Sequence, residues 1–117
     1  MYAVHSELGA GFLETVYKNA VTLLLRNAGL EVFREAPYQV LFHGEMIGLY
    51  RADLVVESKV VVEVKTGRLI DPAHTAQLLN YLRASRINVG LLLNFGPRVE
   101  FKRIICTPRQ RTVVTDP

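Results

Sequence analysis

The sequence predicts an α/β fold in which a mixed sheet carries helices on its faces. Three observations lead to this prediction. An apolar repeat with helical spacing comes first, a second helix with a clear start lies further on, and five strand-like segments surround that helix. The resulting order is helix, three strands, helix, two strands, and a strand–helix–strand succession packs a helix against a sheet.

Two helices are expected. In residues 11–28 the apolar side chains recur at intervals of three and four, which indicates a helix with one buried face, and Gly29 can end it. The second helix begins where Asp71 can cap the backbone and Pro72 fits the first helical position. It is expected to extend to about residue 85.

Five strands are expected, and one of them has a distinctive composition. They lie at residues 31–42 (in one or two pieces, interrupted at Pro37), 47–56, 60–66, 89–95 and 99–105. Residues 89–95 are almost wholly apolar, which is typical of a strand buried on both faces of the sheet.

Length and composition indicate one globular domain, at residues 1–107, followed by a polar C-terminal tail at residues 108–117. No apolar run approaches the roughly 20 residues that span a bilayer, and no secretory signal opens the chain, so a cytoplasmic protein is expected. The single cysteine, Cys106, excludes an intrachain disulfide and a thiolate zinc cluster. Its place after a strand predicts a buried thiol.

The charge pattern permits a polyanionic partner. The formal net charge is +3, the pI is about 9.2, and basic residues gather late in the chain. This group comprises Arg98, Lys102, Arg103, Arg109 and Arg111. Taken alone, a solvated edge strand and tail is the simpler explanation of the group.

Three charged residues, Asp53, Glu63 and Lys65, lie inside segments that are expected to be buried strands. A buried charge is costly unless it is paired or binds a metal. Strand alternation places Glu63 and Lys65 on one face, while Asp53 is expected to share its face with Arg51. If the intervening turn has three residues, 57–59, Asp53 lies opposite Glu63 with Cβ atoms about 5 Å apart. A two-residue turn would put the two carboxylates on opposite faces.

Such a carboxylate pair suits a hard divalent cation, Mg²⁺ or Mn²⁺, because neither a cysteine nor a pair of histidines is nearby. An ion of this kind can activate water beside a phosphodiester bond. Lys65 would stabilise the attacking water or the charge on the phosphate, and Arg51 would bind a neighbouring phosphate. A purely structural alternative stays open, in which Glu63 pairs with Lys65 and Asp53 with Arg51.

Gln77 and Tyr81 lie four residues apart on the second expected helix. The neighbouring Leu78 and Leu82 mark the packing side of that helix, so the pair is expected to face the sheet rather than solvent. From the residues alone, hydrogen bonding between helix and strand is their simplest role.

The acidic strand pair resembles the signature of the PD-(D/E)XK nuclease superfamily. Asp53, nine further residues and then Glu63-Val64-Lys65 match that signature, although Ala52 stands where the proline of the name would be.

Two further motifs strengthen the resemblance. Gln77-Leu-Leu-Asn-Tyr81 is similar to the Q-x-x-x-Y motif of the RecB-like branch of the superfamily. Gly11-Phe-Leu-Glu14-Thr-Val-Tyr17 matches the motif that names the GxxExxY protein family, which is assigned to the same superfamily.

The resemblance implies a restriction-endonuclease-like αβββαβ core and a metal-dependent nuclease that hydrolyses phosphodiester bonds, with DNA favoured over RNA. It implies metal ligation by Asp53, Glu63 and the main-chain carbonyl of Val64, with Glu14 and His5 as further candidates. The residues to which it gives a catalytic role are Asp53, Glu63, Lys65, Gln77, Tyr81 and Glu14. Among these, Gln77 and Tyr81 would orient substrate or water.

Glu14 and His5 also have simpler explanations. An acid near a helix start is favoured by the helix dipole, which accounts for Glu14 equally well. His5 lies nine residues before Glu14, and on an ideal helix that spacing puts the two side chains about 180° apart. Both can reach one site only if Gly9 and Gly11 break the helix.

Three functional hypotheses follow. The first is the metal-dependent nuclease. The second is a catalytically silent nucleic-acid-binding or protein-interaction module on the same fold. The third is a structural role in an oligomer, and a core this small makes a homodimer reasonable.

Overall fold

The computed structural model describes residues 1–107; the predicted tail, with Arg109 and Arg111, lies outside the described residues. The elements along the chain are α1 (Tyr2–Leu8), α2 (Glu14–Asn27), β1 (Val32–Phe42), β2 (Glu45–Val56), β3 (Val60–Lys65), α3 (Pro72–Ser85), β4 (Val89–Phe95) and β5 (Val99–Ile105). Both predicted helices and all five predicted strands are confirmed, and α1 is an additional short helix. No helix within the described residues has the length and hydropathy needed to cross a bilayer.

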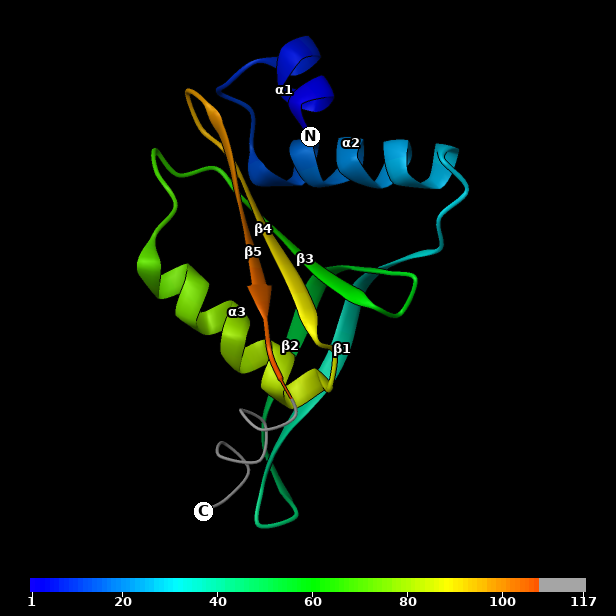
Figure 1. The fold of residues 1–117 in the computed structure, drawn as a ribbon, viewed down its shortest axis with the longest axis vertical. Helices are drawn as coiled ribbons and strands as arrows, with labels where there is room; N and C mark the ends of the chain where they lie inside the picture. The colour runs from blue at the N-terminus through cyan, green and yellow to red at the C-terminus, as the bar shows by residue number, and fades with distance from the viewer. Residues whose placement is uncertain (108–117) are drawn as a thin grey trace.

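The five strands form one mixed sheet in the order β1-β2-β3-β4-β5. β3 and β4 run parallel and are connected through α3, whereas the other neighbouring strands run antiparallel. The helices α2 and α3 lie on different sides of the sheet (Figure 1). The predicted α/β fold is therefore confirmed, and it agrees with the restriction-endonuclease-like architecture.

Each face of the sheet has its own apolar core. The core beneath α2 contains Val4, Tyr17, Val21, Val32, Leu54, Val56, Val62, Val64, Leu93 and Phe95. The core beneath α3 contains Tyr50, Ala52, Val55, Val61, Leu78, Leu82, Ile87, Leu92, Ile104 and Cys106. Cys106 is fully buried, as its sequence setting predicts.

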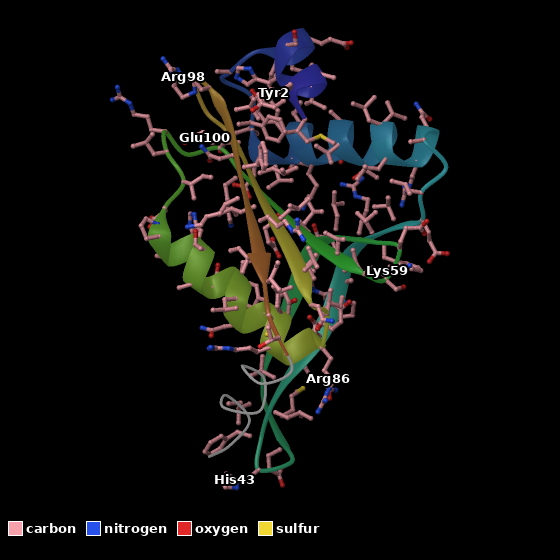
Figure 2. The ribbon with its side chains drawn as sticks, viewed as in Figure 1. Tyr2, His43, Lys59, Arg86, Arg98 and Glu100 are labelled. Atoms are coloured by element: carbon pink, nitrogen blue, oxygen red, sulfur yellow. The ribbon has the colours of Figure 1, made fainter. Side chains whose placement is uncertain are left out.

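The first two strands form a long hairpin at one edge of the sheet. β1 continues through Pro37 without a break, because β1 pairs only with β2 and a missing N–H can be tolerated on an edge strand. The hairpin extends away from α2, and His43 lies at its free end (Figure 2). His43 is exposed.

Two glycines separate α1 from α2. Gly9 and Gly11 have φ angles of +70° and +105°, a region that glycine adopts without strain, so α2 begins only at Glu14. Tyr17 fixes this break from within the core: its hydroxyl donates to the Gly9 carbonyl and its ring stacks on Phe95 with centroids 4.6 Å apart. The glycine and tyrosine of the first-helix motif therefore shape the entry to α2.

The loop after β3 is held tightly against the end of β4. Asn94 is buried, and its Nδ2 donates to the Gly67 carbonyl at 2.8 Å. At Gly96 a Cβ atom would lie only 2.4 Å from the same carbonyl oxygen. The Gly96 carbonyl in turn accepts a hydrogen bond from His5 Nε2 of α1, at 3.0 Å. This packing fixes the chain directly after Lys65.

Replacement of Gly96 by alanine is expected to destabilise the protein by about 2 kcal/mol, because the new methyl group must displace backbone rather than a flexible side chain. Gly48→Ala is a matched control, since its Cβ would make only ordinary contact with Val40 at 3.7 Å. Urea unfolding of both variants measures the difference. Equal stabilities for the two variants would contradict this view of the β3–β4 contact.

Candidate functional site

The turn between β2 and β3 has the length that the site requires. Val56 pairs with Val60 and Leu54 with Val62, so the turn contains the three residues 57–59. Continuing this register places Asp53 opposite Glu63. The predicted three-residue turn is confirmed, and with it the condition for opposed carboxylates.

Regular pairing of β2 and β3 ends just before these two acids. The last pair is Leu54 with Val62, and two residues further along β3 the Val64 amide donates instead to Asp53 Oδ2, at 2.8 Å. The Asp53 carboxylate therefore takes the place of a backbone acceptor where the strands part. Its side chain remains 16% exposed.

Asp53 also marks a change in which face of β2 each side chain presents. Ala52 packs in the α3 core and Leu54 in the α2 core, whereas strict alternation would put both on one face. Regular alternation of the side chains of β2 therefore ends at Asp53. The Asp53 carboxylate lies close to the ammonium of Lys18 on α2. The same carboxylate also interacts with Glu63 of β3. On either side of Glu63, Val62 and Val64 point into the α2 core.

Glu63 is an acid in an unfavourable environment. It is 7% exposed, and its Oε1 has no hydrogen-bond partner among the described residues. Burial raises the pKa of Glu63 well above its usual range, the negative charge of Asp53 adds to this rise, and Lys65 opposes it. The neutral form of Glu63 is therefore favoured in the metal-free protein.

Tyr81 and Gln77 border the acid from α3. Burial raises the pKa of Tyr81, and the negative charge of Glu63 adds to this rise. A hydrogen bond with the Gln77 side chain acts in the opposite direction. The Tyr81 ring stacks on Tyr50 of β2 at a centroid distance of 3.7 Å. Tyr81 is half-buried, as expected, whereas Gln77 is exposed, so the expectation that both side chains face the sheet is wrong for Gln77.

Lys18 of α2 is a site residue that the sequence analysis missed. Its ammonium donates to Glu35 of β1 and lies 3.5 Å from Asp53 Oδ1. Burial lowers the pKa of Lys18, but the Glu35 hydrogen bond and the charge of Asp53 outweigh it and raise the pKa above its usual value. The available signal was its position next to Tyr17, at the edge of the buried stripe of the helix.

The ion pairs expected from a purely structural arrangement do not form. Within residues 1–107 the ion pairs are Lys18 with Glu35 and Lys18 with Asp53. Arg51 is exposed and does not bond Asp53. The structural alternative, in which Arg51 pairs with Asp53 and Lys65 with Glu63, is therefore wrong.

The two further candidate ligands stand apart from the acid pair. The glycines do break the helix, yet no group of three or more His, Cys, Asp or Glu side chains that could hold an ion occurs in the described part of the chain. His5 uses Nε2 to bond the Gly96 carbonyl. Glu14 is half-buried in the first turn of α2. His74 is half-buried near the start of α3.

The donors present nevertheless fit a hard divalent cation. Asp53 and Glu63 offer carboxylate oxygens, and one buried oxygen of Glu63 has no partner within residues 1–107. An ion between the two acids would satisfy this oxygen and remove the repulsion that raises the pKa of Glu63.

Glu63→Gln is expected to stabilise the metal-free protein at neutral and higher pH. Because the folded-state pKa is raised, the folded protein holds this proton more tightly, and the wild type loses stability as pH rises above the ordinary carboxyl pKa. The variant avoids that loss, so its free energy of unfolding should exceed that of the wild type by at least about 1 kcal/mol near pH 8. Near pH 4 the two proteins should differ little. Thermal unfolding in chelator across this pH range measures the difference in stability, with Glu45→Gln, at an exposed position, as the control. A variant less stable than wild type at pH 8 would contradict the interpretation.

Comparisons with known proteins agree with this fold. The family model described as "PD-(D/E)XK nuclease superfamily" matches residues 1–104. The chain is also similar in structure to the crystal structure of SSO0001, with a TM-score of 0.62 and 24% sequence identity, over 86% of this chain. It spans 53% of the length of that protein, so the likeness concerns the fold. No curated protein matches the chain. On the family match over nearly its whole described length, the chain belongs to the PD-(D/E)XK nuclease superfamily.

Proposed function

We propose that the protein is a metal-dependent nuclease that hydrolyses phosphodiester bonds of nucleic acid, with DNA as the favoured substrate. The observation that carries the proposal is the opposed pair Asp53 and Glu63, in which one buried Glu63 oxygen lacks a partner within residues 1–107. Members of this superfamily generally use divalent metal ions and act on nucleic acid. An acid pair that is largely shielded from solvent destabilises the metal-free fold, and binding of a cation would offset that cost.

The ion would be held by Asp53, Glu63 and the main-chain carbonyl of Val64. All three are oxygen donors, and this chemistry favours Mg²⁺ or Mn²⁺. When bound, such an ion supplies activation of water and neutralisation of charge on a phosphate oxygen. The hydrogen bond from the Val64 amide to Asp53 supports the proposal, because it orients one carboxylate next to the other.

Lys65 would act on the substrate phosphate. It is half-buried at the end of β3, and its positive charge already acts on Glu63. An ammonium at this place can stabilise negative charge that develops on the phosphate or hold the attacking water. Arg51 is exposed on β2 and could bind a neighbouring phosphate of the same strand.

Gln77 and Tyr81 would orient the substrate beside the acid pair. The stack of Tyr81 on Tyr50 fixes the ring, and the bond to Gln77 fixes the hydroxyl. This arrangement supports assignment to the RecB-like branch. The spacing of Gly11, Glu14 and Tyr17 likewise supports assignment to the GxxExxY group.

Nuclease activity is tested with labelled single- and double-stranded DNA and RNA in Mg²⁺ or Mn²⁺. Wild type is expected to cut at least one substrate, with chelator abolishing the reaction. Lys65→Ala should reduce the rate by about a hundredfold or more, because a charge-stabilising donor is lost. Lys59→Ala, at the exposed β2–β3 turn, is the matched control and should cut like wild type. Equal cutting by wild type and Lys65→Ala would refute the catalytic assignment.

Binding of Mn²⁺ is expected to release a proton and to strengthen as pH rises from about 6 to about 8, since Glu63 must ionise to bind the ion. Calorimetric titrations in two buffers with different ionisation enthalpies measure both effects. Glu63→Gln removes the ligand and should abolish binding. A pH-independent affinity with no proton release would argue against Glu63 as a ligand.

A catalytically silent nucleic-acid-binding module is the second candidate function. It is favoured by one observation: within residues 1–107 the site gathers two carboxylates rather than a cluster of three ligands. Binding of nucleic acid that weakens with salt, without metal-dependent cutting, would support this alternative over the nuclease.

A further inference from the structure

An irregularity in β1 lies directly opposite Asp53. β1 and β2 pair in register from Val32 with Val56 onwards, yet Glu35, which would face Asp53, forms no pair. Glu35 has a φ angle of +52°, a left-handed conformation that is strained for a non-glycine residue. Such a conformation persists only where surrounding contacts hold it, so the contacts of Glu35 carry information.

The contact that holds Glu35 is Lys18. The Lys18 ammonium bonds Glu35 and lies 3.5 Å from Asp53 Oδ1, so one cation joins carboxylates from two strands. Lys18 and Asp53 are only 14% and 16% exposed in their side chains, whereas Glu35 is 47% exposed. The pair of Lys18 and Asp53 is thus shielded from solvent, where an ionic interaction is stronger than at the surface.

Both oxygens of Asp53 are therefore engaged. Oδ1 faces the Lys18 ammonium, and Oδ2 accepts the Val64 amide. A divalent ion that takes Asp53 as a ligand must share the carboxylate with an ammonium a few ångströms away. Like charges at that distance repel by kilocalories per mole in a partly buried site, so the ammonium and the ion compete.

We infer that Lys18 and Glu35 set the affinity of the Asp53–Glu63 pair for its metal ion. The Lys18 ammonium balances the charge of Asp53 in the metal-free protein and opposes binding of the ion. Glu35 is the counter-charge that retains the ammonium when the ion binds. This inference rests on the proposed metal site and adds two positioning residues to it, on α2 and β1.

A direct role for Lys18 at the substrate does not fit its position. Its ammonium lies between α2 and the sheet, bonded to Glu35, whereas Tyr81 and Gln77 border the acid pair from α3. Lys18 therefore acts through Asp53, and its effect belongs to metal affinity rather than to contact with phosphate.

Calorimetric titration with Mn²⁺ alone, at fixed pH and without nucleic acid, tests this inference. Lys18→Met is expected to bind Mn²⁺ about tenfold more tightly than wild type, since a competing charge is removed. Lys18→Arg keeps the charge and should bind like wild type. Lys59→Met, which removes a lysine at the distant β2–β3 turn, controls for net charge and should also bind like wild type (Figure 2).

Glu35→Gln is a second, independent variant. Within residues 1–107 it leaves the Lys18 ammonium with Asp53 as its one carboxylate partner, and it should weaken Mn²⁺ binding about threefold or more. Glu45→Gln, at the exposed hairpin end, is its control and should not change the affinity. This variant keeps the test decisive if Lys18→Met fails to fold.

Thermal unfolding supplies a readout that does not depend on titration. In chelator, Lys18→Met should have a lower Tm than wild type, because Asp53 and Glu63 lose their compensating charge. In saturating Mn²⁺ that deficit should shrink or vanish, since the tighter-binding variant gains more from the ion.

The outcomes separate the two proposals. Wild type and Lys18→Met that bind Mn²⁺ equally, or a variant that binds more weakly, would overturn the role of Lys18 while leaving the metal site intact. A folded wild type that binds no Mn²⁺ at all would overturn the metal site, and the inference with it. Tighter binding by Lys18→Met and weaker binding by Glu35→Gln support both.

Discussion

The hydrogen bond from the Val64 amide to Asp53 Oδ2 is the interaction on which the candidate site depends. Pairing of β2 and β3 stops at Leu54 and Val62, and from there a side-chain carboxylate replaces the backbone acceptor. Without it, the amide of a fully buried residue would lose its partner, at a cost of about 1–3 kcal/mol. The same bond holds the carboxylate where β2 and β3 part, next to Glu63. One hydrogen bond thus both completes the backbone pairing of β3 and positions the Asp53 carboxylate.

The charges around this contact are balanced imperfectly. Lys18 compensates Asp53 from the α2 side, while Glu63 is buried with one oxygen unpartnered within the described residues. Glu35, which pairs with the same ammonium, has a left-handed backbone conformation. A fold selected for stability alone would replace such an acid with an apolar side chain. We propose instead that the arrangement serves to bind a cation, which would supply part of the stability of the protein.

Much of the fold and part of the site could be predicted from the sequence. The three-residue turn 57–59 was enough to place Asp53 opposite Glu63, because the length of the turn fixes the register of the two strands. Lys18 could not be found in this way, since its partners come from two other elements and a lysine on a helix is usually solvated. The change of face at Asp53 was also beyond prediction, because it depends on the backbone of Glu35 in the neighbouring strand.

The central claim is that Asp53 and Glu63 together bind a divalent ion. A crystal of the protein soaked in Mn²⁺, with data collected at a wavelength where manganese scatters anomalously, tests this claim most directly. The account predicts one anomalous peak between the two carboxylates, with the Val64 carbonyl as a third ligand at roughly 2.2 Å. A fully soaked crystal with no peak there, or with manganese bound only at surface acids, would contradict it.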